Sequence, residues 1–186
     1  ILKLSFVNLF KTKNLRSLES YNSEIYLIIQ GNGTQNLLNE GFYLEPSEVY
    51  VNGVQNISCK KICHLTDDKN NITLNFSSQL VSFENMFLSL DNIIEVDLSN
   101  FDTSKITSMS SMFKNCINLV SVNLSNSNTN NLTNMSYVFY KCSNLTIINF
   151  GNLNTSLVED MKFLFSGCSS IKPIDTSQFD TSKLTN

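Results

Sequence analysis

The sequence predicts an α/β solenoid, in which 26-residue units stack behind a β-rich N-terminal cap and each unit holds one short strand and one short helix. Three observations support this fold class. Phenylalanines recur at a fixed step of 26 residues, namely Phe87, Phe113, Phe139 and Phe165. Within a unit, hydrophobicity first alternates with a period of two and later recurs every three or four residues, as in a strand followed by a helix.

The repeat includes at least seven positions in one common register. Examples are the columns Met109, Met135 and Met161; Cys116, Cys142 and Cys168; and Val96, Val122, Ile148 and Ile174. We therefore divide the chain into an N-terminal capping region, residues 1–79, and a repeat region, residues 80–186, with three full units and a truncated one. The chain lacks an initiator Met and stops in mid-pattern, so we expect it to be part of a longer protein.

Each unit is expected to contribute one strand and one helix to the stack. Val122 and Leu124 alternate with polar residues, which predicts a strand with one buried face. Leu132, Met135, Phe139 and Cys142 follow at steps of three, four and three, which is the spacing of one helix face. Strands pack about 4.8 Å apart and helices about 8–10 Å apart, so the stack must curve into a horseshoe with a concave parallel sheet and convex helices.

The first 79 residues read as short strands. Ile25, Leu27 and Ile29 alternate with their neighbours, as do Ile72, Leu74 and Phe76. Asn52-Gly53 lies between two strand-like segments and is a strong hairpin signal. We expect the strand at 72–76 to pair with the first repeat strand, and residues 1–20 to form either a short helix or a further strand.

The repeat resembles a known family. The segment from Ile93 to Cys116, IIEVDLSNFDTSKITSMSSMFKNC, is similar to the BspA-like leucine-rich repeats, in particular to a subtype of mycoplasma-type and protist surface proteins. The likeness covers residues 80–186, with departures such as Ser127 for Phe101. It implies a leucine-rich-repeat horseshoe in a secreted or cell-surface protein, and in some members adhesion to host or matrix proteins. It carries over no catalytic residue.

Composition and motifs argue against several function classes. The net charge of −3 gives no reason to expect nucleic-acid binding, and no apolar segment is long enough to span a bilayer. His64 is the sole histidine, and no nucleophile motif surrounds it. We therefore predict a protein that is not an enzyme and that carries no cofactor and no metal.

The cysteines fall into two groups. Cys116, Cys142 and Cys168 occupy one repeat position, and stacked helices would hold them too far apart for disulfides, so buried free thiols are expected. Cys59 and Cys63 lie four residues apart in a partly polar segment and are candidates for a local disulfide. With His64 they are also weak candidates for metal ligands, although no fourth ligand follows at a zinc-site spacing.

If the protein binds a partner, the candidate binding residues are those that flank the buried strand positions and are predicted to point into the concavity. These are Glu95, Asp97, Ser121, Asn123, Ile147, Asn149, Pro173 and Asp175. We predict an extracellular or cell-surface recognition module whose concave face binds a protein or matrix partner. Two alternatives stay open: a self-associating component of an extracellular coat or filament, and a face that is only ordinary solvated surface.

Overall fold

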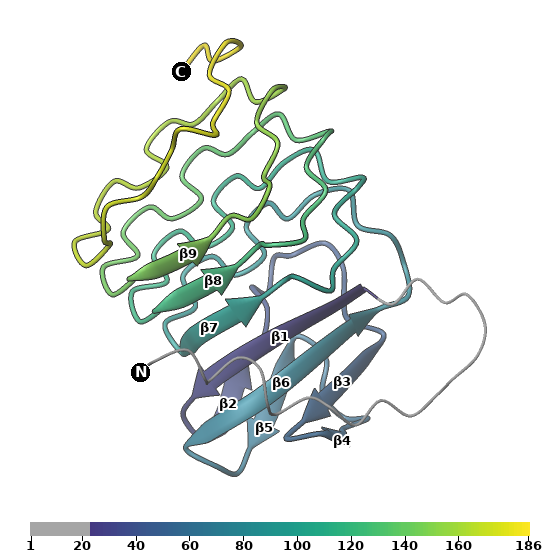
Figure 1. Ribbon diagram of the computed structural model, residues 1–186. Helices are drawn as coiled ribbons and strands as arrows, with labels where there is room; N and C mark the ends of the chain where they lie inside the picture. The colour runs from purple at the N-terminus through teal and green to yellow at the C-terminus, as the bar shows by residue number, and fades with distance from the viewer. Residues whose placement is uncertain (1–22) are drawn as a thin grey trace.

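The computed structural model describes residues 23–186, whose strands form two sheets (Figure 1). The strands are β1 (Ser23–Gln30), β2 (Gly33–Asn36), β3 (Glu48–Val51), β4 (Val54–Gln55), β5 (Ile62–Leu65), β6 (Lys69–Phe76), β7 (Ile93–Asp97), β8 (Ser121–Asn123) and β9 (Ile147–Asn149). The larger sheet has the order β4-β3-β6-β1-β7-β8-β9, and the smaller sheet pairs β2 with β5. The prediction for residues 1–20 falls outside the described part of the chain.

The N-terminal part of the large sheet is antiparallel, and the strands predicted there are confirmed. The alternating residues of β1, among them Ile25, Leu27 and Ile29, are buried on one face, and the same pattern holds along β6. The hairpin between β3 and β4 is confirmed as well. Asn52 and Gly53 have φ values of 51° and 84°, and two positive φ angles are what a tight two-residue hairpin turn requires.

β1 joins this antiparallel part to the repeats. Leu27 of β1 lies opposite Val96 of β7, whereas β6 pairs with β1 and β3. The predicted pairing of residues 72–76 with the first repeat strand is therefore wrong, because both edges of β6 are already occupied. One sheet runs across the boundary that we predicted between residues 79 and 80, and that boundary stays a prediction.

Successive repeats are joined along two ladders. β7, β8 and β9 pair in parallel, with Val96 opposite Val122 and Val122 opposite Ile148. Isolated parallel bridges form the second ladder and link Ser82, Ser108, Asn134 and Asp160. Between the ladders the repeated phenylalanines Phe87, Phe113, Phe139 and Phe165 stack with ring centroids 5.4, 5.5 and 5.8 Å apart. The stacked turns of the chain are visible in the upper half of Figure 1.

The predicted helices are wrong, because no helix occurs among residues 23–186. The segments that carry the three-four-three spacing are runs of tight turns. In the second unit Ser111 and Asn115 have φ values of 56° and 63°, and a right-handed helix excludes residues in this left-handed region. The N–H groups of this segment also bond to the next unit and not within a helix. Ser111 and Phe113 donate to the carbonyls of Ser136 and Val138, each at 2.9 Å.

The predicted leucine-rich-repeat horseshoe is wrong as well, because it requires a layer of helices. The described chain is all-β with a mixed seven-stranded sheet, so an α/β solenoid with convex helices is wrong. Backbone hydrogen bonds join neighbouring units on the turn side as well as on the strand side, and no layer of helices forces the units apart there. Spacing misled the prediction because two tight turns in succession direct apolar side chains inward at the same steps as a helix face.

Side-chain-capped turns account for the many Asn, Ser and Asp residues of the repeats. At one position of each unit a side-chain oxygen accepts the backbone N–H two residues further on, a turn that Asx side chains favour. The pairs are Asp102 with Ser104, Asn128 with Asn130, Asn154 with Ser156, and Asp180 with Ser182, at 2.9–3.2 Å. These residues hold corners of the repeat.

Candidate functional site

The residues predicted to bind follow the three repeat strands and their continuation. Glu95 and Asp97 lie on β7, Ser121 and Asn123 on β8, and Ile147 and Asn149 on β9. Pro173 and Asp175 occupy the same repeat positions in the next unit, where no strand forms. The structure thus aligns all eight in two neighbouring rows, but their surroundings differ between the two ends of the rows.

At the β7–β8 end the candidate side chains are bonded to one another. Ser121 is only 5% exposed and its hydroxyl lies 3.4 Å from a carboxylate oxygen of Glu95. Asn123 donates its amide to Asp97 at 3.1 Å, and the same Asp97 oxygen accepts the backbone N–H of Ser99 at 2.8 Å. These groups stabilise the packing of one unit on the next, which leaves them less available to a partner.

At the other end the remaining four candidates line a groove of about 410 Å³ between β9 and residues 171–178. Ile147 is 55% exposed, and Asn149, Pro173 and Asp175 are also exposed. Further lining residues are Thr146, Ile148, Phe150, Gly151, Ile171, Lys172, Ile174 and Gln178. The groove therefore has an apolar wall with charged and amide groups along it.

The groove exists because the strand ladder stops at β9. In the earlier units the backbone N–H groups of Leu98 and Leu124 donate to carbonyls of the next unit, those of Asn123 and Asn149, at 2.9 and 2.8 Å. Within residues 23–186 the equivalent N–H of Phe150 makes no backbone hydrogen bond to the following unit. The carbonyl of Val120 accepts the N–H of Thr146 in the next unit. The equivalent carbonyl one unit later, that of Thr146, accepts no backbone hydrogen bond from the fourth unit within the described residues.

Pro173 gives the physical reason. It stands at the repeat position of Ser121 and Ile147, which pair with each other in the parallel ladder. Proline has no N–H to donate, so it ends a ladder or lies at an edge. The fourth unit still bonds to the third on the turn side, where Tyr137 and Phe139 donate to its carbonyls at 2.8 and 3.1 Å. The groove is thus a local opening in an otherwise bonded pair of units.

Charges of both signs border the groove. The hydroxyl and then the backbone N–H of Ser177 lower the pKa of the Asp175 carboxyl below its ordinary value, so Asp175 is ionised at neutral pH. Lys172 precedes Pro173 on the same segment and lines the same groove. The arrangement can hydrogen-bond an extended backbone and bury apolar side chains, with a cation and an anion to orient the ligand.

Sequence reasoning missed part of this site. Phe150, Ile171, Lys172 and Gln178 line the groove but were not among the predicted binding residues. A signal was present, since Pro173 is the sole proline of the repeat region and falls on a strand position. A proline there indicates a broken ladder and so an open edge next to it.

One comparison with known proteins identifies a family. Residues 70–186 match the family model described as a Mycoplasma protein of unknown function, DUF285. The chain belongs to this family. Membership supports a mycoplasma-type repeat, and it does not by itself identify the narrower BspA-like leucine-rich repeats. No curated protein and no solved structure matches the chain. Among the described residues of this family member, no helix is long and apolar enough to cross a membrane.

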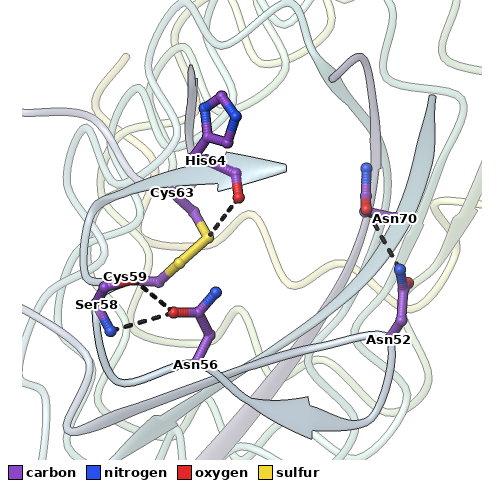
Figure 2. The surroundings of a disulfide bond; sticks show 7 residues. All are labelled: Asn52, Asn56, Ser58, Cys59, Cys63, His64 and Asn70. Carbon is purple, nitrogen blue, oxygen red and sulfur yellow. Dashed lines mark hydrogen bonds between the residues drawn. A yellow bond between two sulfur atoms is a disulfide. The ribbon is translucent and has the colours of Figure 1, made fainter. Parts of the chain in front are cut away.

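Cys59 and Cys63 form a disulfide, with their Cα atoms 4.7 Å apart (Figure 2). Both residues are buried, and the loop that they close leads into β5. Asn56 stabilises the turn just before this loop. Its side-chain oxygen accepts the backbone N–H of Ser58 at 3.1 Å and the hydroxyl of Ser58 at 2.7 Å. Sulfurs joined to each other supply no thiolate, so Cys59, Cys63 and His64 do not act together as metal ligands in this state.

The repeat cysteines are free thiols that donate to the preceding unit. The Sγ atoms of Cys116 and Cys142 lie 2.9 and 3.0 Å from the carbonyl oxygens of Phe87 and Phe113. Burial raises the pKa of Cys116 to about 12 and raises the pKa of Cys142 as well. The thiolate is the nucleophilic form of cysteine. These thiols therefore serve packing rather than chemistry at neutral pH.

Proposed function

We propose that this protein is a secreted or cell-surface recognition module that binds a protein or matrix partner through the strand-bearing face of its repeats. The observation that carries the proposal is the groove beside β9, where an open backbone edge and exposed apolar side chains lie together. Sheet edges of this kind accept an added strand from a partner, whose main chain provides affinity and whose side chains provide specificity.

The binding mode follows from the groups that line the groove. An extended partner segment pairs with the edge of β9, where it accepts the N–H of Phe150 and donates to the carbonyl of Thr146. One of its apolar side chains packs against Ile147, whose side chain is 55% exposed in the groove. Lys172 and Asp175 favour a partner segment that carries charges of both signs.

Three features support an extracellular location. Structural disulfides such as Cys59–Cys63 persist mainly in oxidising compartments. The repeats resemble those of BspA-like surface proteins, some of which adhere to host or matrix proteins. The chain also holds many Asn-X-Ser/Thr sequences, for instance at Asn56 and Asn144, which are compatible with a glycosylated secreted protein.

The test is a binding screen of the purified protein against immobilised fibronectin, laminin and collagen, by biolayer interferometry. Ile147→Glu places a charge in the groove and is expected to lower the affinity for a bound partner by tenfold or more, about 1.4 kcal/mol. Ile117→Glu is the matched control, because Ile117 is similarly exposed at 45% but lies outside the groove. Equal binding by the wild type and Ile147→Glu contradicts the proposal, as does the absence of any bound partner in the panel.

A second variant tests the open edge itself. Pro173→Ser restores a backbone donor at the position of Ser121, so residues 171–175 are expected to pair with β9 and close the groove. Partner binding should then fall while the free energy of unfolding rises. If Pro173→Ser binds as well as the wild type, the backbone edge of β9 takes no part in recognition.

The same open edge favours one other candidate, self-association into a coat or filament, because a second copy can also pair with β9. Light scattering with size-exclusion chromatography separates the two candidates. A monomer over a wide concentration range refutes self-association. Reversible growth into oligomers that Pro173→Ser abolishes refutes recognition of a foreign partner as the use of this edge.

A further inference from the structure

A second surface feature lies on the turn side of the repeats, in segments separate from the strands. We name it the aromatic–lysine patch, and it consists of Tyr137, Tyr140, Phe163, Lys114, Lys141 and Lys162. The ring centroid of Phe163 lies 5.2 Å from that of Tyr137 and 6.2 Å from that of Tyr140, and the two tyrosine rings are 5.6 Å apart. Phe163 is 50% exposed, so the three rings form one continuous surface rather than part of the core.

The patch is a departure from the repeat. Tyr137 and Phe163 occupy the position that Asn85 and Ser111 hold in the first two units. All four have φ between 55° and 58°. Asn tolerates the left-handed region, whereas a bulky aromatic residue there is an outlier that costs of order 1–3 kcal/mol. Packing does not require these aromatic rings, because the first two units form the same turn with small polar residues.

The ammonium groups of the three lysines lie over the aromatic rings and not beside carboxylates. The Nζ of Lys114 lies 5.0 Å from the ring centroid of Tyr137 and 5.7 Å from that of Tyr140. Lys141 lies 5.3 Å from the ring of Tyr140, and Lys162 lies 5.7 Å from the ring of Phe163. Within residues 23–186 none of the three forms an ion pair, and each ammonium keeps donors for a ligand.

The carboxylate of Asp160, which lies close to the patch in sequence, bonds to a backbone N–H and to none of the three ammonium groups. Asp160 precedes Lys162 by two residues, and its carboxylate accepts the backbone N–H of Lys162 at 2.8 Å as part of a turn. The chain as a whole carries a net charge of −3, whereas three ammonium groups gather on this one surface. The local charge favours an anionic ligand.

The spacing of the charges indicates the form of that ligand. Lys114, Lys141 and Lys162 come from three successive units, which backbone hydrogen bonds hold at the strand-like separation of about 4.8 Å. The charges therefore span three stacked units, at three different positions of the repeat. A linear polyanion with a charge on each monomer can reach lysines on successive units, and the exposed ring of Phe163 offers an apolar surface on which a sugar ring stacks.

We propose that the aromatic–lysine patch binds a linear acidic polysaccharide, whose sulfate or carboxylate groups pair with the lysines while a sugar ring stacks on Phe163. This ligand class fits better than a lipid bilayer. The rings pack against one another and only Phe163 is half-exposed, so the patch presents no set of apolar side chains deep enough to insert among lipid tails. The site is independent of the groove beside β9.

The experiment measures binding of heparin-derived sulfated oligosaccharides by titration calorimetry, with neutral dextran oligosaccharides as the comparison ligand. Phe163→Ala and Lys114→Gln are each expected to weaken binding about five- to tenfold. Lys114→Arg keeps the charge and should retain most of the affinity. Lys183→Gln is the matched control, since it removes an exposed lysine of the repeats that is outside the patch, and it should change affinity less than about twofold.

Three outcomes overturn the proposal: no binding of the sulfated oligosaccharide, equal binding of dextran, or equal losses in Lys183→Gln and Lys114→Gln. A fourth is tighter binding to vesicles of anionic phospholipid than to the oligosaccharide with the same dependence on Phe163, which assigns the patch to a membrane surface. Circular dichroism of each variant verifies folding. Ile147→Glu should leave polysaccharide binding unchanged, so failure at the groove and failure at the patch are distinguishable.

Discussion

The substitution Ser111→Gly should stabilise this protein, although the same change destabilises an α-helix. Ser111 lies in the segment whose apolar spacing resembles a helix, but its φ is 56°. An L-residue in the left-handed region loses roughly 1–2 kcal/mol, and glycine avoids that loss. Glycine costs about 0.5–1 kcal/mol in extra entropy of the unfolded chain, so the net gain is about 0.5–1 kcal/mol. The side chain of Ser111 has no hydrogen bond within the described residues that the change would remove.

Urea unfolding monitored by circular dichroism measures the difference, and a gain of 1 kcal/mol raises the melting temperature of a domain this size by about 2–4 °C. Ser110→Gly is the matched control at the next residue. Its φ is not positive and its hydroxyl lies 3.0 Å from that of Ser136, so the change should destabilise by about 1 kcal/mol or more. Destabilisation by Ser111→Gly as well would refute the turn geometry, since it is the result that a helix gives.

Further outcomes can be measured with the same unfolding assay and with thiol titration. Gly151→Ala should destabilise by about 2 kcal/mol or more, because φ is 55° and the added Cβ would lie 2.2 Å from the carbonyl oxygen of Ser125; a neutral effect would contradict the close approach. Phe113→Ala should cost about 3–5 kcal/mol, since its ring is fully buried between two others, whereas Phe163→Ala should cost less than about 1 kcal/mol. A maleimide reagent should label three thiols per chain after unfolding without reductant and five after reduction. Rapid labelling of more than one thiol in the native chain would show that the buried Cys116 or Cys142 is accessible, because Cys168 alone is only partly buried. Hydrogen bonds from the Ser104 hydroxyl and then from the Ser104 backbone N–H lower the pKa of Asp102. The ionised carboxylate therefore stabilises the fold at pH above about 3.9, the pKa of Asp in the unfolded chain, and this contribution is lost as the pH falls through the lowered pKa of the folded state. Asp102→Asn should weaken this acid dependence.

Local patterns in the sequence predicted the local elements of the N-terminal region. The alternation of Ile25, Leu27 and Ile29 gave β1, and Asn52-Gly53 gave the β3–β4 hairpin, because both depend on neighbouring residues alone. Strand order was beyond such patterns. Alternation is the same for β1 and β6, and only packing decided that β1 leaves an edge for β7.

The alignment of repeat positions accounts for part of the groove lining, while binding at these residues stays a prediction. Equivalent positions in successive units were correctly aligned, so Ile147, Asn149, Pro173 and Asp175 do lie at one groove. Their exposure could not be inferred from the repeat, which treats Ser121 and Ile147 as equal although one is buried and the other exposed. The difference arises because a following unit pairs with β8 and none pairs with β9.

The sequence by itself determined the 26-residue period, the buried positions within it and the polar residues that turn the chain. Tertiary structure decided the backbone conformation of the segments around Phe113 and Phe139. A step of three and four residues between apolar side chains is common to a helix and to successive tight turns, so the spacing alone does not separate the two. The hydrogen bonds that these turns make with the next unit exist only in the stack, and they favour the turns over the helix.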